Sequence, residues 1–322
     1  PDTRALGMAA CGGLLTGGWR MGMSEDDVEA VFIEGRELAR RSGELATECL
    51  LVAVHAAVRG GAGDLQRYVD GSLEAAPLAE RSGEPRVVSA AAMVLVYAHY
   101  SAGRLNEAWE FVNEFLDHPP EETRPAIEPS GLSAYAWMET VGRSIGSFMG
   151  MLDAGRVAQR RGIEIARGLG DLESLSWGCG FASYLAEFSG EVEGCLERCR
   201  EGFEIAERMA DPYSRAYSSG RLGVAHQVRK EWEEAIDCLN SALALARQHR
   251  PGVEAEAHWL SYLALAQLSL GRTDAAHEAV RQAVAVAQQR GTRGYEIPSR
   301  LAMARVLRQS EGTDANAEIN AA

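Results

Sequence analysis

The side chains best suited to chemistry in this sequence are three cysteines in its second half. Cys195 and Cys199 lie four residues apart on an expected helix, and Cys179 lies on the helix before it. Three thiols brought together in this way could bind zinc or supply a nucleophile. Cys195 and Cys199, however, fall on positions that face the paired helix, where small apolar residues belong. Because a buried cysteine behaves as a small hydrophobic residue, we expect these thiols to pack.

Other groups that could support catalysis lack partners at a useful spacing. The run 24–27, Ser-Glu-Asp-Asp, could suggest a metal site, but it also fits a helix start, with Ser24 as the cap and carboxylates in the first turn. The histidines within expected helices have no second ligand nearby: His55, His99, His226 and His258. Lys230 is the only lysine and is followed by glutamate, so there is no P-loop. We therefore predict no catalytic residue, no metal site and no cofactor in this chain.

A repeat of about forty residues organises the sequence and must position these side chains. Its signature is an aliphatic residue followed by alanine, and successive copies are spaced by 40, 87, 40, 40 and 41 residues. The copies are Leu38-Ala39, Leu78-Ala79, Ile165-Ala166, Ile205-Ala206, Leu245-Ala246 and Val286-Ala287. The spacing of 87 fits two units plus a short insertion. Within the units, Gly103, Gly190 and Gly271 mark turns between two helices, because glycine commonly ends a helix in a left-handed conformation.

The arrangement of small and large residues in these units resembles the tetratricopeptide repeat. In the unit 217–249, Leu222-Gly223 occupy the inner pair of the first helix, and Ala235, Leu239 and Ala242 occupy the matching positions of the second. Small side chains let two helix axes approach to about 8–10 Å. We therefore predict an all-α fold, a tetratricopeptide-like superhelical array of about seven helix pairs with a repeat near 40 residues.

One segment interrupts the array. Residues 118–130 contain Pro119, Pro120, Pro125 and Pro129, a density that no helix interior tolerates. We predict a proline-rich loop at 118–130 that divides the array into an N-terminal half, residues 1–117, and a C-terminal half, residues 131–322.

Composition limits the partners and the location. The chain has 32 Lys+Arg against 46 Asp+Glu, a net charge of −14, which disfavours binding to nucleic acid. No apolar run reaches the ~20 residues of a membrane helix, and no secretory signal opens the chain. Six cysteines without a CxxC pair do not indicate a disulfide scaffold. We expect a cytoplasmic location without nucleic acid or membrane as a partner.

The concave face of the expected array is the best candidate for a binding site. First helices line that face in stacked helix pairs. Extrapolating the repeat places on it Tyr97, Tyr100, Trp177, Tyr184, Phe188, Tyr217, Gln227 and His258. Aromatic side chains with polar tips suit recognition of a protein or peptide. The alternative is that several of these residues only pack between repeats.

Four short motifs resemble segments of large bacterial class III adenylate/guanylate cyclases. They are residues 18–26 (GWRMGMSED), 133–137 (SAYAW), 211–215 (DPYSR) and 290–296 (RGTRGYE). In that family a cyclase domain is followed by an AAA/STAND-type ATPase and a long tetratricopeptide-like array, and this chain resembles the array alone. The resemblance implies a regulatory or sensory segment, with an ATP-binding, cyclic-nucleotide-forming parent whose catalytic residues lie elsewhere.

Three hypotheses for function follow. The first is a regulatory, protein-interacting repeat module of a cyclase–ATPase signalling protein, whose partners are a protein or peptide, a small signal molecule, and upstream domains of the same parent chain. The second is the sensor array of a LuxR-type ATPase transcription regulator. The third is a free-standing scaffold. A cyclase domain upstream would favour the first, and a C-terminal helix-turn-helix in the parent would favour the second.

The purified segment is expected to show no catalytic turnover, because it lacks a P-loop and any nucleophile–base pair at a recognisable spacing. Assays of ATP hydrolysis and of cyclase activity test this. An activity that disappears when one of the segment's own residues is substituted would contradict it.

Overall fold

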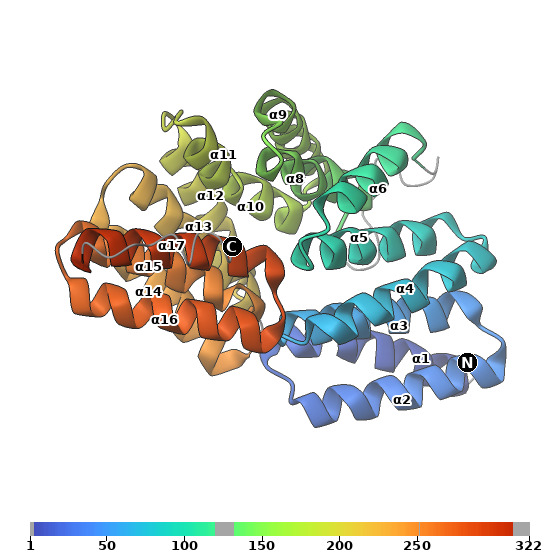
Figure 1. The fold of residues 1–322 in the computed structure, drawn as a ribbon. Helices are drawn as coiled ribbons and strands as arrows, with labels where there is room; N and C mark the ends of the chain where they lie inside the picture. Colours follow the sequence, from blue (N-terminus) through green and yellow to red (C-terminus); the bar gives the residue numbers. More distant parts are fainter. Residues whose placement is uncertain (1–2, 120–131, 251, 312–322) are drawn as a thin grey trace.

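Helices arranged in antiparallel pairs make up the computed structural model of this chain, which describes residues 3–119, 132–250 and 252–311 (Figure 1). Within these ranges there is no β-strand. The first six helices are α1 (Thr3–Gly13), α2 (Glu25–Ser42), α3 (Leu45–Gly61), α4 (Leu65–Ser82), α5 (Pro85–Ser101) and α6 (Leu105–Asp117). Short π- and 3₁₀-helical turns, η1 (Leu14–Gly18) and η2 (Trp19–Met21), connect α1 to α2.

The remaining helices continue the same alternation. They are α7 (Ala134–Trp137), the π-helical η4 (Met138–Gly142), α8 (Arg143–Phe148), α9 (Leu152–Leu169), α10 (Leu172–Gly180), α11 (Ala182–Ser189), α12 (Cys195–Met209), α13 (Pro212–Val228), α14 (Trp232–His249), the 3₁₀ turn η5 (Val253–Ala255), α15 (Glu256–Ser269), α16 (Thr273–Arg290) and α17 (Arg293–Glu311). Two first helices are interrupted, one by η4 and the other at Phe181 between α10 and α11. Counting each interrupted helix once, the described residues form seven pairs followed by α17, which confirms the predicted all-α, tetratricopeptide-like array.

The repeated aliphatic–alanine signature lies at the end of each second helix. Its alanines are buried, as at Ala39, Ala166 and Ala287, which are 0% exposed. The next residues end the helix: the N–H groups of Gly43, Gly170 and Gly291, all at positive φ, reach back to those alanine carbonyl oxygens. Each copy of the signature therefore marks a close contact between helices and the end of a second helix. Because both features occur once per repeat, the signature recurs with a constant period.

Small residues set the spacing within the pairs. A Cβ built on Gly223 of α13 would lie 2.8 Å from Cγ of Leu239 and 3.2 Å from the carbonyl oxygen of Ala235 in α14. Ala264 of α15 is 0% exposed. The predicted inner positions are thus places where helices approach too closely for a larger side chain.

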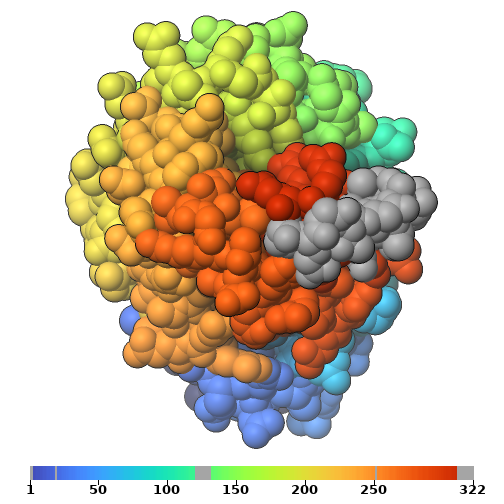
Figure 2. Space-filling view, turned by 60° about the vertical axis from the view of Figure 1, so that its left-hand side comes forward, coloured from blue at the N-terminus to red at the C-terminus, as the bar shows by residue number. Residues whose placement is uncertain are grey.

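The array curls until its two ends touch. The N–H of Gly252 donates to the carbonyl oxygen of Gly61, 3.2 Å away. Arg20 forms a bidentate ion pair with Glu173 of α10, both N···O distances being 2.7 Å. Figures 1 and 2 show the C-terminal helices against the N-terminal ones, and α17 contacts α5. Contacts between repeats that are far apart in sequence therefore close the concave face.

One continuous hydrophobic core crosses both of the expected halves, from Ala56 to Val306. The division at 118–130 stays a prediction, and most of that loop lies at residues 120–131, outside the described residues. None of the described helices is long and apolar enough to cross a membrane.

Replacing Gly223 by Leu should destabilise the protein by roughly 1–3 kcal/mol, because the new side chain overlaps Leu239 of α14. Urea unfolding measures the change. Gly168→Leu is the matched control, because Gly168 is an exposed helical glycine with open space at its Cβ. Equal unfolding midpoints for Gly223→Leu and the wild-type chain would mean that this helix contact is not close.

Candidate functional site

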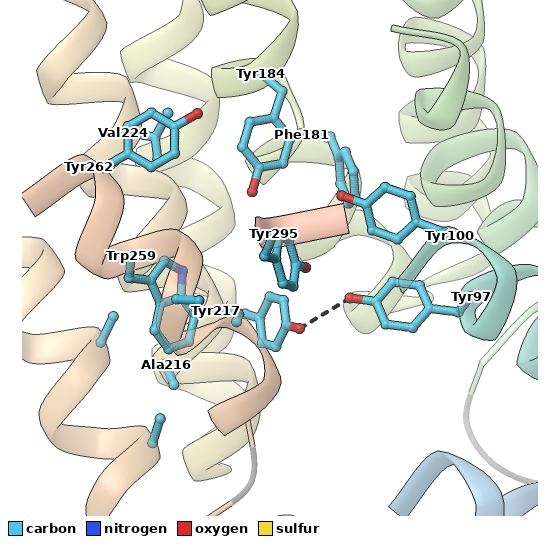
Figure 3. Close-up of a cluster of buried hydrophobic side chains, with 14 of the residues drawn as sticks. Tyr97, Tyr100, Phe181, Tyr184, Ala216, Tyr217, Val224, Trp259, Tyr262 and Tyr295 are labelled. Carbon is cyan, nitrogen blue, oxygen red and sulfur yellow. Dashed lines mark hydrogen bonds between the residues drawn. The ribbon is translucent and has the colours of Figure 1, made fainter. Parts of the chain in front are cut away.

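Six of the eight predicted concave-face residues meet at the axis of the curled array. They are Tyr97 and Tyr100 of α5, Trp177 of α10, Tyr184 of α11, Tyr217 of α13 and His258 of α15. Phe181, Tyr262 of α15 and Tyr295 of α17 join them, and we call these nine residues the aromatic cluster. All of them except Trp177 and His258 are labelled in Figure 3. Residues separated by up to about two hundred positions in sequence thus share one site.

The other two predicted residues lie at or outside the edge of the aromatic cluster. Phe188 is 42% exposed at the end of α11, with its ring 6.5 Å from that of Tyr184. Gln227 lies near the end of α13, and its side-chain oxygen has no hydrogen-bond partner among the described residues. No ring contact or hydrogen bond described for the aromatic cluster involves Gln227.

The aromatic cluster is shielded from solvent, which corrects the expectation of an open aromatic groove. Tyr184 and His258 are 2% and 4% exposed. The rings of Tyr262 and Tyr295 lie 4.8 and 5.0 Å from that of His258, so the last helices cover the concave face. The six predicted residues of the aromatic cluster pack between repeats in this structure, and the part of all eight in recognition stays a prediction.

Arg221 is the charged residue of this site that sequence reasoning missed. It is 5% exposed, and its guanidinium carbon lies 3.7 Å from the ring centre of Tyr184 and 4.5 Å from that of Phe181. A Cβ on Gly180 would lie 2.9 Å from the Arg221 side chain, so the glycine at the α10–α11 break makes room for it. The available signal was an arginine next to Leu222-Gly223 on an otherwise small and apolar inner face.

A chain of hydroxyl groups connects the aromatic cluster to a buried carboxyl group that sequence reasoning also missed. The Tyr97 and Tyr217 hydroxyl oxygens are 3.1 Å apart, and Tyr217 donates to Oε1 of Glu254, 2.7 Å away. Burial raises the pKa of Glu254 to about 7 and the pKa of Tyr217 well above its usual value. Glu254 lies in the turn η5, directly before α15, and it reaches Tyr217 on α13, the first helix of the adjacent pair.

His258 is held in its neutral form. Burial, and then the charge of Arg221, lower the pKa of His258 well below its usual value. Its Nε2 shares a 2.5 Å hydrogen bond with the Tyr184 hydroxyl. A neutral imidazole with one tyrosine partner can accept or donate a hydrogen bond, but it adds no positive charge beside Arg221.

The space left inside this site is small. A cavity of about 10 Å³ is lined by Tyr97, Ser176, Trp177, Phe181, Tyr217, Ser218 and Arg221. That is room for about one water-sized species. No group of three or more His, Cys, Asp or Glu residues among the described positions is arranged to hold a metal ion. Cys179, Cys195 and Cys199 are buried against their paired helices, as predicted for packing residues.

A second, open groove lies over α2, α3 and α4. Its volume is about 640 Å³, and its lining includes Glu25, Asp26, Glu29, Phe32, Arg36, His55, Arg59, Arg67, Asp70 and Glu74. The rings of Phe32 and His55 stack 3.9 Å apart at its floor. Ser24 caps α2 beside this groove and accepts from the N–H of Asp27, which confirms the predicted helix start.

Residues 213–289 match the tetratricopeptide repeat family model. No curated protein matches the chain significantly. The match covers the repeats from α13 to α16, where the inner small residues were easiest to recognise in the sequence.

Solved structures with the same fold support the array as a whole. A Rap protein complexed with competence and sporulation factor superposes with a TM-score of 0.69 at 13% identity, over 99% of this chain and 85% of that one. Aspartyl phosphate phosphatase F from Bacillus subtilis gives 0.51 at 12% identity, over 99% and 83%. A STAND protein with a tetratricopeptide repeat sensor from Pyrococcus horikoshii gives 0.52 at 13% identity, over 95% of this chain and 44% of that one. At these identities the likeness concerns the fold alone.

The buried carboxyl group of Glu254 should make stability depend on pH. Its pKa is raised from 4.5 to about 7 by folding, so its contribution is fully present below about pH 4.5 and is lost as the pH rises to about 7. Relative to Glu254→Gln, the wild-type chain should therefore lose roughly 3 kcal/mol of unfolding free energy over that interval.

Urea unfolding at several pH values tests this difference. Glu164→Gln is the control, because Glu164 is exposed on α9 and its substitution should leave the wild-type pH profile unchanged. A constant difference between wild type and Glu254→Gln from pH 4.5 to 8 would show that this carboxyl group does not titrate in the interior.

Proposed function

We propose that this chain is a regulatory interaction module whose aromatic cluster responds to a protein segment or a small signal. One observation carries the proposal. The aromatic cluster gathers side chains from α5, α10, α11, α13, α15 and α17 around Arg221, which has no carboxylate partner among the described residues. A purely structural core would not need a buried charge at that point, because apolar residues of similar volume stabilise a core as well or better.

Such a module needs two states, and in this proposal they are the closed array and an array opened at its axis. The contacts that shield the aromatic cluster join early and late repeats, for example Tyr97 to Tyr217 and Gly252 to Gly61. A partner that enters the axis must change these contacts, and it regulates only if it binds one state better than the other. A coupling free energy of ~1–3 kcal/mol is typical of such devices.

The comparisons support a recognition role without identifying the partner. The Rap protein was solved in complex with competence and sporulation factor, and the STAND protein carries a tetratricopeptide repeat sensor. By analogy we propose a protein, a peptide or a small signal molecule as the partner, together with upstream domains of the same parent chain.

The nature of the parent is a finer proposal. A class III adenylate/guanylate cyclase with an ATPase domain rests on the four sequence motifs alone. A LuxR-type ATPase transcription regulator and a free-standing scaffold are the alternatives. The coding sequence upstream of Pro1 distinguishes these alternatives. A cyclase domain encoded there supports the cyclase parent, and a different domain in that place contradicts it.

Trp177→Ala combined with Tyr184→Ala should abolish the response of the full-length parent to its signal, because the two rings lie in the proposed site. The measurements are the parent's regulated activity and the unfolding midpoint of the same variant. Trp232→Ala is the matched control, because Trp232 is half-buried at the start of α14, outside the aromatic cluster.

Two outcomes separate the alternatives. A folded double variant without response supports the site. Lost stability with a normal response in the folded fraction means that the aromatic cluster only packs, and Phe32→Ala then tests whether the open groove over α2–α4 binds the partner instead.

A further inference from the structure

Arg221 differs from the other well-buried arginine, Arg59, in lacking a counter-charge. Arg59 is 9% exposed and pairs with Glu25 and with Asp64. Arg221 is 5% exposed, forms no ion pair within residues 3–119, 132–250 and 252–311, and leaves its Nη1 without a hydrogen-bond partner. A buried guanidinium normally has a carboxylate or another acceptor beside it, since an isolated charge is costly to remove from water.

The two acidic side chains that contact the aromatic cluster bind tyrosine hydroxyls. Glu254 accepts from the Tyr217 hydroxyl, and Glu187 accepts from the Tyr262 hydroxyl. The other titratable groups that face Arg221 are His258, which is neutral, and four tyrosines whose pKa values burial raises, so none of them supplies a negative charge: Tyr97, Tyr100, Tyr262 and Tyr295. The faces of Tyr184 and Phe181 stabilise the guanidinium through their ring electrons, but they accept no strong hydrogen bond from its edge. The positive charge of Arg221 therefore remains uncompensated within the described part of the chain.

Hydrogen-bond donors surround the water-sized cavity at this point. The cavity is lined by Arg221 together with Trp177, Tyr97, Ser176 and Ser218. Nε1 of Trp177, like Nη1 of Arg221, is buried without a partner. An indole N–H and a guanidinium can only donate, so both need an acceptor, and the cavity has room for one small species.

We propose that Arg221 and Trp177 bind a small monovalent anionic group, either a free halide ion such as chloride or the carboxylate of a bound signal. This inference deepens the proposed function, on which it rests, by naming the chemistry that the site recognises. The anionic group takes the place of the missing carboxylate and accepts from Nη1 of Arg221 and Nε1 of Trp177. Ser176 and Ser218 lie at the same cavity, but their hydroxyls donate to backbone carbonyl oxygens of Gly202 and Ser214.

Such a site would tie distant repeats together. Tyr97 belongs to α5, Trp177 to α10 and Arg221 to α13, so an anion held among them bridges the third, fifth and sixth helix pairs. Its binding should favour the closed array, because Tyr97 of the third pair reaches the other lining residues, which belong to the adjacent fifth and sixth pairs, only when the array is curled.

Thermal unfolding of the purified chain at constant ionic strength tests the proposal. Sodium gluconate, whose anion is too large for the cavity, is replaced stepwise by sodium chloride in one series and by sodium acetate in another. We expect Tm to rise by roughly 2–4 °C at saturating concentration of the anion that fits. A response to chloride assigns the site to a free halide, and a response to acetate assigns it to a carboxylate. Identical Tm values in all three salts would overturn the proposal.

Three variants locate the effect. Arg221→Met removes the charge, keeps a similar volume and should abolish the anion response. Arg59→Met removes a buried arginine with carboxylate partners and should leave the response intact. Trp177→Phe keeps a ring and removes one donor, so the half-saturating concentration should increase roughly tenfold. A response that persists in Arg221→Met, or one that is unchanged in Trp177→Phe, would contradict the assignment.

Failure of this inference and failure of the proposed function are distinguishable. The salt titration uses the isolated chain and needs no partner or parent. In one result, the isolated chain does not respond to anions, while the Trp177/Tyr184 double variant of the parent loses its response to the signal. That result contradicts the anion site and leaves the proposed function standing. In the opposite result, the isolated chain responds to an anion and the double variant of the parent still responds normally to its signal. That result contradicts the recognition role and identifies the anion as a structural ion.

Discussion

The close approach of helices at small residues is the constraint on which this structure depends. A single helix pair cannot bury its apolar face, so each pair must pack against the next at a fixed distance. Glycine at position 223 and alanine at positions such as 39, 166 and 287 permit that distance. Because every unit repeats the same spacing, small rotations between units accumulate into a curl.

The curl determines the character of the concave face. In an open array, aromatic residues on first helices would face water. Here the last helices close over them, and Gly252 reaches Gly61 across most of the chain. Side chains that the repeat placed on a surface become an interior, and polar groups there must find partners across large sequence separations. Tyr97 and Tyr217 succeed in this, whereas Arg221 has no acidic partner in the described structure.

The sequence predicted what depends on the repeat and missed what depends on closure. Helix pairs, helix ends and inner small positions follow from a period of about forty residues, and the structure confirms them. Six of the eight candidate site residues meet in the aromatic cluster, because the repeat period places equivalent positions of successive first helices on the same face. Their burial depends on contacts between distant repeats, such as Tyr97 with Tyr217. Arg221 and Glu254 contact the adjacent pair instead, through single side chains that the repeat signature does not include. No local periodicity encodes such contacts.

Closure also explains why polar chemistry is concentrated at the axis. Apolar packing between adjacent repeats holds the array together and does not depend on contacts between its two ends. Among the polar contacts at the axis, the hydroxyl pair Tyr97–Tyr217 joins distant pairs, the carboxyl group of Glu254 extends it, and the guanidinium of Arg221 lies at the same cavity. Burial raises the pKa of Glu254 to about 7, so the charge of this carboxyl group changes with pH near neutrality. The stability of the curled array should therefore depend on pH at its axis, and on an anion as well if the proposed site is occupied, without any change in the packing that specifies the fold.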